Sequence, residues 1–281
     1  MKNYFSIIFI SFIFSQGNYQ ILSTPSNFKD TFQFNEFYQN HSYSVFNSSL
    51  PSDINIFSAT ISSRLLNKVN SQSLYFLTLK NIDYGKLIDS ETNYQFGAYE
   101  SAIEFNIFRD NYLEDIDFLF SMGYLKSSID IFDSEAIYIS CKGVLPILDD
   151  DEIIFHLENL GEVINSYSNS DITLPETARL SYMINTKFPF SILLDYEKRL
   201  DLNNVVLYGT IHMDINSKLD LYVSTNSDRS DLFYGDYIQE LTAGLRIGLS
   251  YSKGLNLFNL GFQDLGAAGY STSFSFSKII L

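Results

Sequence analysis

The chain has 281 residues, a formal net charge of −15 and a single cysteine, Cys141. This length suffices for one large core or one closed barrel. The acidity argues against a nucleic-acid partner, because phosphate backbones recruit Lys and Arg. One cysteine excludes an internal disulfide framework and a cysteine-based zinc site. Aromatic residues form 16% of the chain, with 25 Phe, 20 Tyr and no Trp, which is typical of a β protein with aromatic girdles.

The first 17 residues, "MKNYFSIIFISFIFSQG", have the pattern of a secretory signal peptide. Lys2 precedes an apolar stretch from Tyr4 to Phe14, and Ser15 and Gly17 supply the small residues of a cleavage site. The stretch is too short to cross a membrane comfortably, and no other segment approaches about 18 consecutive apolar residues. We therefore expect an exported chain that begins near Asn18 and that can enter a membrane only as a barrel.

From residue 42 onward, apolar and polar residues alternate with the period of two that is typical of β-strands. The last strand, "GYSTSFSFSKIIL", is the clearest case, because Tyr270, Phe274 and Phe276 share one face and four serines occupy the other. The same alternation predicts an outward face that carries Phe118, Phe120, Leu219 and Leu221. The full pattern predicts about 14 strands, near 42–47, 53–65, 73–82, 95–108, 115–125, 133–143, 152–160, 177–185, 189–197, 204–213, 218–226, 238–251, 255–263 and 269–280.

Short and long connections alternate along this series. Turns such as 186–188 and 214–217 are short, whereas 83–94, 161–176 and 227–237 are longer. Outer-membrane barrels distinguish their periplasmic turns from their extracellular loops in this way. The sequence thus predicts an all-β protein, an outer-membrane antiparallel β-barrel over 42–281 that follows an N-terminal segment, 18–41. The apolar strand faces then meet lipid and the serines face the lumen; a soluble secreted β-sandwich is the alternative.

Candidate chemistry is sparse. His156 and His212 fall on polar strand faces and His41 precedes the first strand, but no motif marks a nucleophile beside any of them. The acidic run that ends at Glu152 lacks the glycine and ligand spacing of a calcium loop, so a solvated turn is expected. Cys141 lies on an apolar face and should behave as a small hydrophobe. We expect no catalytic, cofactor-binding or metal-binding residue.

The long connections carry the best candidates for partner contacts. Their length exceeds what a hairpin needs, and such excess length is usually functional or disordered. The aromatic residues in or beside them are of the type that anchors interfaces, and an arginine lies among acidic residues in the last one. These predicted partner-binding residues are Tyr94, Tyr167, Arg229, Phe233, Tyr234 and Tyr237. The alternative is an acidic loop layer that only keeps the surface soluble or meets cation-bridged lipopolysaccharide.

Several stretches, taken in order, resemble a known family. They are "LTLKNIDYGK", "FHLENLG", "LPETARLSYMIN", "LDYEKRLDL", and "LYVSTNSDRSDL" followed by "LTAGLRIGLSYSKGLNLFNLGF". Together they resemble the PorV/PorQ family of FadL-like outer-membrane barrels of the type IX secretion system, and are most similar to its PorQ branch. The segment 18–47 lacks the family's usual plug motifs, so a FadL-like barrel with a reduced N-terminal plug is expected.

The resemblance implies a non-enzymatic outer-membrane subunit of a Gram-negative bacterium. Such a subunit anchors or shuttles a secreted or surface partner protein, and its partners are other secretion or attachment-complex proteins, secreted cargo and membrane lipid. No cofactor is implied. Two other functions remain open on the sequence: a FadL-type transporter of hydrophobic small molecules, and a hydrolase of the lumen or surface.

Overall fold

A computed structural model describes residues 41–64, 73–88, 92–113, 116–147, 151–167, 173–200, 204–227 and 242–280. The predicted signal peptide and N-terminal segment therefore lie outside the described residues. No helix in the described ranges is long and apolar enough to span a membrane. The strands are β1 (Ser42–Ser49), β2 (Asn55–Arg64), β3 (Ser73–Ile88), β4 (Gln95–Leu113), β5 (Ile116–Ile129), β6 (Phe132–Pro146), β7 (Glu152–Asn165), β8 (Thr177–Asn185), β9 (Phe190–Arg199), β10 (Asn204–Asn216), β11 (Leu219–Asn226), β12 (Arg246–Lys253), β13 (Asn256–Asp264) and β14 (Tyr270–Ile279).

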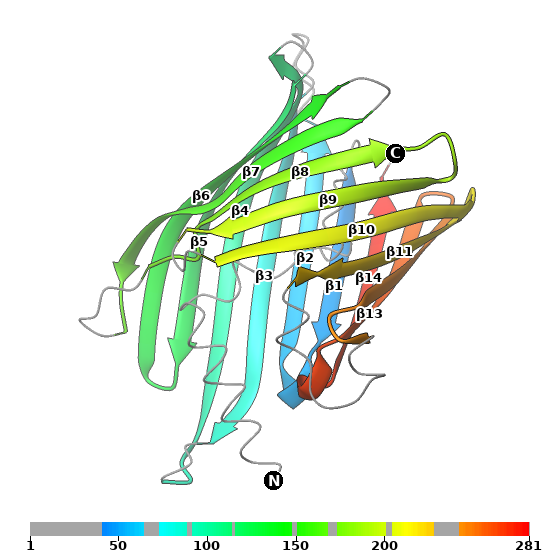
Figure 1. Cartoon of the computed structure of the whole chain (residues 1–281). Coiled ribbons are helices and arrows are strands. Elements are labelled where there is room, and N and C mark those ends of the chain that lie inside the picture. The colour runs from blue at the N-terminus through cyan, green and yellow to red at the C-terminus, as the bar shows by residue number, and fades with distance from the viewer. Residues whose placement is uncertain are drawn as a thin grey trace.

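The 14 strands form one closed antiparallel barrel in which each strand pairs with its sequence neighbours. The seam pairs β1 with β14, from Ser42 opposite Ile279 to Ser49 opposite Thr272. Closure leaves no unpaired sheet edge at this seam, which is what a strand structure needs in a membrane. The strands at the front of the barrel cross those behind it obliquely (Figure 1), as expected for strands tilted about the barrel axis.

The predicted barrel and its strand order are confirmed, but several strand ends were predicted wrongly. β3 continues to Ile88 and β7 to Asn165, so the first parts of the predicted loops 83–94 and 161–176 are strand. β5 likewise continues beyond its predicted end, to Ile129. β5 and β6 are joined by a tight turn at Asp130 and Ile131. β12 begins at Arg246, not at residue 238.

β-bulges explain two of these errors. In β3 the pairing with β4 shifts between Asp83 and Lys86, and Gly85 has φ of +69°. In β7 the pairing with β6 shifts beside Asn159, which has φ of +60°. A bulge inserts one residue and so reverses the alternation beyond it. The sequence pattern therefore breaks at each bulge although the strand continues.

The outer surface is apolar between two rings of tyrosines. Outward residues such as Leu79, Ile103 and Phe274 are exposed, although they are large hydrophobics. Exposed apolar side chains around a closed barrel mark a lipid-facing surface. The tyrosines that flank this surface are Tyr43, Tyr182 and Tyr251 near the short turns and Tyr99, Tyr124, Tyr196 and Tyr270 near the opposite end. Such girdles lie at the two membrane interfaces, so the outer surface is that of a transmembrane barrel.

The inner wall carries the polar residues of each strand. The final strand behaves as predicted, since Phe274 is exposed outward whereas Ser271 and Ser275 are buried inward. Polar side chains of adjacent strands pair with each other: Asn259 Nδ2 donates to Ser275 Oγ at 2.7 Å, and the Thr60 and Thr78 hydroxyls lie 3.1 Å apart. These cross-strand hydrogen bonds satisfy groups whose burial would otherwise be costly.

Candidate functional site in the barrel lumen

Apolar side chains cover the inner wall over β1–β6 toward the long-loop end. Inward residues of these strands form one buried cluster, with Leu125 and Tyr138 among its members at 0% and 2% exposure. Leu174, which precedes β8, packs into the same cluster. Side chains that line an open aqueous pore would be exposed. The apolar side chains on this part of the inner wall are therefore packed and shielded from water.

A hydrogen-bonded group joins β3, β4 and β6 next to this cluster. Lys80 Nζ lies 3.1 Å from Glu104 Oε1, and the Tyr138 hydroxyl donates to the same carboxylate at 2.8 Å. Tyr138 reaches Glu104 because its ring lies across Gly123 on the intervening strand β5, where a Cβ atom would be only 2.2 Å from the ring. The glycine therefore makes room for a tyrosine to lie flat along the inner wall.

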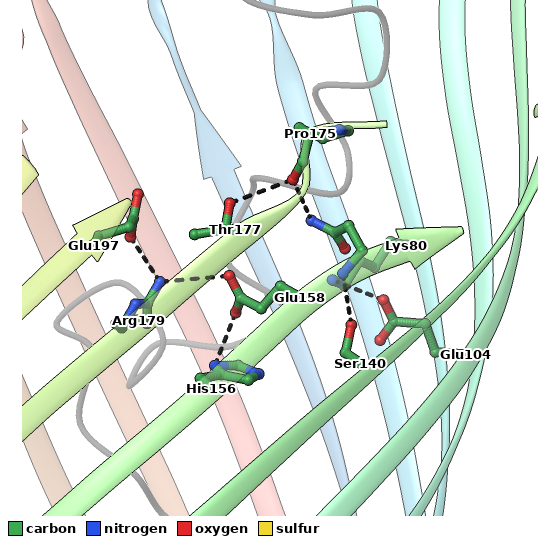
Figure 2. A network of polar contacts seen from close by, with 10 residues as sticks. Lys80, Glu104, Ser140, His156, Glu158, Pro175, Thr177, Arg179 and Glu197 are labelled. Atoms are coloured by element: carbon green, nitrogen blue, oxygen red, sulfur yellow. Dashed lines mark hydrogen bonds and ion pairs between the residues drawn. The ribbon is translucent and has the colours of Figure 1, made fainter. Parts of the chain in front are cut away.

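A second polar group joins β7, β8 and β9 (Figure 2). The carboxylate of Glu158 lies 3.0 Å from His156 Nδ1 and 3.7 Å from Arg179 Nη2. The same Arg179 nitrogen lies 3.0 Å from Glu197 Oε2. His156 is thus on the polar inward face, as predicted, and its close partner is a carboxylate. One guanidinium bridges two carboxylates that would otherwise repel each other.

The bulge of β7 fixes the segment that leads into β8. Asn159 donates from its backbone N–H to Ser140 Oγ at 3.0 Å and from Nδ2 to the Pro175 carbonyl oxygen at 3.2 Å. The Thr177 hydroxyl donates to the same carbonyl oxygen (Figure 2). Leu174 and Pro175 are both buried. The end of the loop between β7 and β8 is therefore held against the inner wall.

The charged lining continues onto β9 and β12. Asp195 is buried on the inward face of β9, within electrostatic reach of Arg179. The Arg246 guanidinium lies 5.9 Å from the centre of the Tyr208 ring, a cation–π arrangement. Three cations and four carboxylates thus follow one another from β3 to β12: Lys80, Arg179 and Arg246 with Glu104, Glu158, Asp195 and Glu197. Opposite charges that lie close together on this wall attract one another and help to hold neighbouring strands together.

The other two histidines lie apart from this network. His41 Nδ1 is 3.2 Å from Ser63 Oγ at the short-turn end of the barrel. His212 faces inward on β10, where its ring stacks on Tyr222 at 4.6 Å between centroids. The three histidines are thus spread over distant parts of the wall and do not form one cluster.

Of the predicted partner-binding residues, the structure describes Tyr94 and Tyr167. Tyr94 is 55% exposed, and its hydroxyl donates to Asp130 Oδ1 at 3.1 Å, which raises the pKa of Tyr94 above its ordinary value. Tyr167 instead donates a hydrogen bond to Ser127, a buried residue on the inward face of β5. The other four, Arg229, Phe233, Tyr234 and Tyr237, lie outside the described residues.

The sequence contains the residues of the lumen network but does not show that they contact one another. The sequence places His156 on a polar strand face, but the position of Arg179 beside His156 and Glu158 depends on the register of β7 and β8. Arg179 and Glu197 lie 18 residues apart and meet because they are directly opposite in β8 and β9. Register is set by the whole barrel, so spacing along the chain carries no signal for it.

A closed 14-strand barrel with an apolar belt, two tyrosine girdles and a polar lining is a transmembrane β-barrel of the outer-membrane class. No protein-family profile matches the sequence, and no curated protein is significantly similar to it. Among solved structures, the chain is similar to the deltaS2S3 mutant of the TodX monoaromatic hydrocarbon channel, with a TM-score of 0.59, 9% identity, and coverage of 94% of this chain and 95% of that one.

Two further solved structures were matched by the same comparison. The deltaS2 mutant of TodX gives a TM-score of 0.53 at 9% identity over 85% of this chain and 89% of that one. The Acinetobacter baumannii outer membrane protein Omp33 gives 0.47 at 10% identity over 86% and 98%. At such identities the TodX likeness concerns the fold, and it is consistent with the predicted FadL-like barrel.

Proposed function

We propose that this chain is a non-enzymatic outer-membrane subunit of a type IX secretion system that binds and anchors a secreted or surface partner protein. The observation that carries the proposal is the covered inner wall over β1–β6, where packed apolar side chains replace the water of an open pore. A barrel that is filled in this region suits a scaffold better than a diffusion channel.

The stretches that resemble the PorV/PorQ family support the same proposal by their position. They contribute Lys80 from β3, Glu158 and Asn159 from β7, and Arg179 from β8. The stretch "LDYEKRLDL" adds Asp195 and Glu197 of β9. Three of the stretches therefore meet in the network of β7–β9, and the fourth places Lys80 in the neighbouring polar group, within electrostatic reach of Glu158.

The partner contact in this proposal lies at the long-loop end. Tyr94 is exposed beside the β5–β6 turn, where Ile131 is 81% exposed and Phe132 is also exposed. Exposed aromatic and aliphatic residues at a loop tip are suitable interface anchors. Tyr167 contributes indirectly, because it fixes the start of the β7–β8 loop to the inner wall.

The experiment is deletion of the gene that encodes this chain, followed by complementation with the wild-type gene or a variant. The expected result is that proteins bearing type IX sorting domains leave the cell surface, and that the wild-type chain restores them. A variant that combines Tyr94→Ala with Ile131→Asp should assemble normally yet fail to restore attachment. The matched control is Ile164→Asp, because Ile164 is also well exposed, at 59%, near the end of β7 but outside the proposed contact. Unchanged surface attachment in the deletion strain would contradict the proposal.

A second candidate function is a FadL-type transporter of hydrophobic small molecules, supported by the likeness to a monoaromatic hydrocarbon channel. The purified chain in liposomes would then accelerate entry of a monoaromatic hydrocarbon relative to empty liposomes. Lost hydrocarbon uptake with normal surface attachment in the deletion strain would favour this function over the first.

A further inference from the structure

The hairpin of β10 and β11 brings three metal-ligating side chains together at the short-turn end of the lumen. Asp214 of β10 is directly opposite Asp220 of β11, and His212 is directly opposite Tyr222. All four positions follow the inward alternation of their strands. Like charges directly opposite each other repel, and a cation bound between the two carboxylates would reduce this repulsion.

The geometry of the three side chains fits one metal ion. One ligand atom from each of His212, Asp214 and Asp220 can be chosen so that all lie within 4.8 Å of one another. His212 Nε2 lies 3.3 Å from Asp214 Oδ1. A tetrahedral site with bonds of about 2.0–2.1 Å requires about 3.3–3.4 Å between ligand atoms. The His212–Asp214 edge therefore already has the length that zinc needs.

The surroundings support the same site. Tyr222 is 1% exposed and stacks on the His212 ring with the two planes 17° apart, which fixes the orientation of the imidazole. Ser250 of β12 is directly opposite Asp220. It is also 1% exposed, and its hydroxyl has no hydrogen-bond partner within the described part of the chain. A buried, unsatisfied hydroxyl beside a carboxylate pair is the kind of group that a bound ion or its water would satisfy.

We propose that His212, Asp214 and Asp220 bind a divalent transition-metal ion, with Zn²⁺ as the best match, at the short-turn mouth of the barrel. The imidazole selects zinc over calcium and magnesium, which prefer all-oxygen sites. Three protein ligands leave a fourth position for a water molecule near Ser250. Asp214 is exposed at this mouth, so the ion has an entry path. The bound ion ties β10 to β11 beside their turn.

This site was not expected from the sequence. His212 and Asp214 share a strand face, but Asp220 joins them only because the turn at residues 217–218 sets the register of the hairpin. The proposal is independent of the secretion function, because it requires only the folded barrel.

The test is a calorimetric titration of tag-free, chelator-treated barrel in detergent with Zn²⁺. The expected result is one saturable site per chain, with Ca²⁺ and Mg²⁺ binding much more weakly. His212→Gln and the double variant Asp214→Asn/Asp220→Asn should each weaken Zn²⁺ binding by at least about a hundredfold, since even outer-shell changes cost 10–100-fold. Ser250→Ala should weaken it by about tenfold.

The matched control is His41→Gln, which removes a histidine at the same end of the barrel but outside the cluster and should leave Zn²⁺ affinity unchanged. The heat-modifiable mobility of each variant on a gel confirms that its barrel is folded. A Co²⁺ titration provides a second readout, because loss of His212 should abolish the visible spectrum of a nitrogen-ligated tetrahedral site. The proposal is overturned by unchanged Zn²⁺ affinity in the folded variants, by the absence of saturable binding, or by equal affinity for Ca²⁺.

Discussion

Gly123 and Gly209 are both strand glycines, but only one of them is required by its surroundings. A Cβ atom on Gly123 would lie 2.2 Å from Cζ of Tyr138, whereas one on Gly209 would meet nothing within 4 Å. Gly123→Ala should push Tyr138 away from Glu104 and break the partly buried hydrogen bond between them. We expect a loss of about 1–3 kcal/mol in the free energy of unfolding, the usual cost of overpacking, measured by urea unfolding in lipid vesicles.

Gly209→Ala is the control for this prediction. It should leave the stability unchanged or raise it slightly, because alanine restricts the unfolded chain more than glycine does. Equal losses for the two variants would show that the effect comes from strand glycines in general, and not from the contact with Tyr138.

Arg179 is the single residue on which the β7–β9 network depends most. It lies between the carboxylates of Glu158 and Glu197, and removal of one partner from a buried ion pair typically costs about 3–5 kcal/mol. Arg179→Gln should therefore be strongly destabilising in the same unfolding assay. Because the cost comes from uncompensated carboxylates, Glu197→Gln in the Arg179→Gln background should recover part of it.

The exposed ion pair between Lys126 and Asp133 supplies the contrast. Its two side chains are 40% and 49% exposed, although their 3.1 Å separation is as short as that of a buried pair. Exposed pairs contribute little because water and salt screen them. Lys126→Gln should leave the unfolding midpoint unchanged, and a loss comparable to that of Arg179→Gln would contradict this assignment of the energetics to burial.

At the scale of whole elements, the sequence predicted the existence and order of the strands but not all of their ends. Alternation was sufficient because each strand has one face toward lipid and one toward the lumen. It failed at the bulges beside Gly85 and Asn159, where the alternation reverses within a continuous strand. The alternation also predicts a longer loop where the structure has a tight turn at Asp130. Asp130 adopts a φ of +56°, a conformation that usually requires glycine, so no glycine marks the turn in the sequence.

The candidate site was less predictable than the strands for a related reason. The inward positions of His156 and His212 followed from alternation within one strand. Arg179 and Asp220, which complete the two groups, come from neighbouring strands, and their positions are fixed by register. Register depends on turn lengths and bulges around the barrel, so pairings across strands required the structure.

The two faces of β14 lead to a prediction for that element. Phe274 is 46% exposed and lies near the middle of the strand, whereas its neighbour Ser275 is buried and accepts a hydrogen bond from Asn259. Phe274→Arg should cost about 2–4 kcal/mol, as charged residues do on the lipid face near the bilayer midplane. Ser275→Ala should cost only about 1 kcal/mol, the net value of a hydrogen bond. The measurement is unfolding in vesicles. A larger cost for Ser275→Ala than for Phe274→Arg would contradict the assignment of Phe274 to the lipid face.

On the scale of the whole molecule, the lumen is divided into unlike sectors. Toward the long-loop end, β1–β6 carry a buried apolar lining. The ionic groups lie on strands from β3 to β12, and β14, β1 and β2 carry inward serines such as Ser275, Ser44 and Ser58. Small polar side chains at the seam allow the wall to close without large groups between β1 and β14. The lumen sites exist only if the barrel is closed, and a membrane-spanning sheet must have no unpaired edge. Closure is thus the property to test.

Closure can be tested by a disulfide across the seam in a Cys141→Ser background. Ser44 is directly opposite Ser277 in the β1–β14 pairing, and opposite residues in antiparallel strands have Cα atoms about 4.5–5.5 Å apart, within the range of a disulfide. Ser44→Cys with Ser277→Cys should therefore form an intramolecular disulfide on mild oxidation, seen as faster migration on a denaturing gel without reductant. The control is Ser44→Cys with Ser273→Cys. Ser273 pairs with Ser48, four residues farther along β1, which places it about 13 Å from Ser44 at the rise of a strand. That pair should not form a disulfide. Disulfide formation in both pairs, or in neither pair, would contradict a closed barrel in this register.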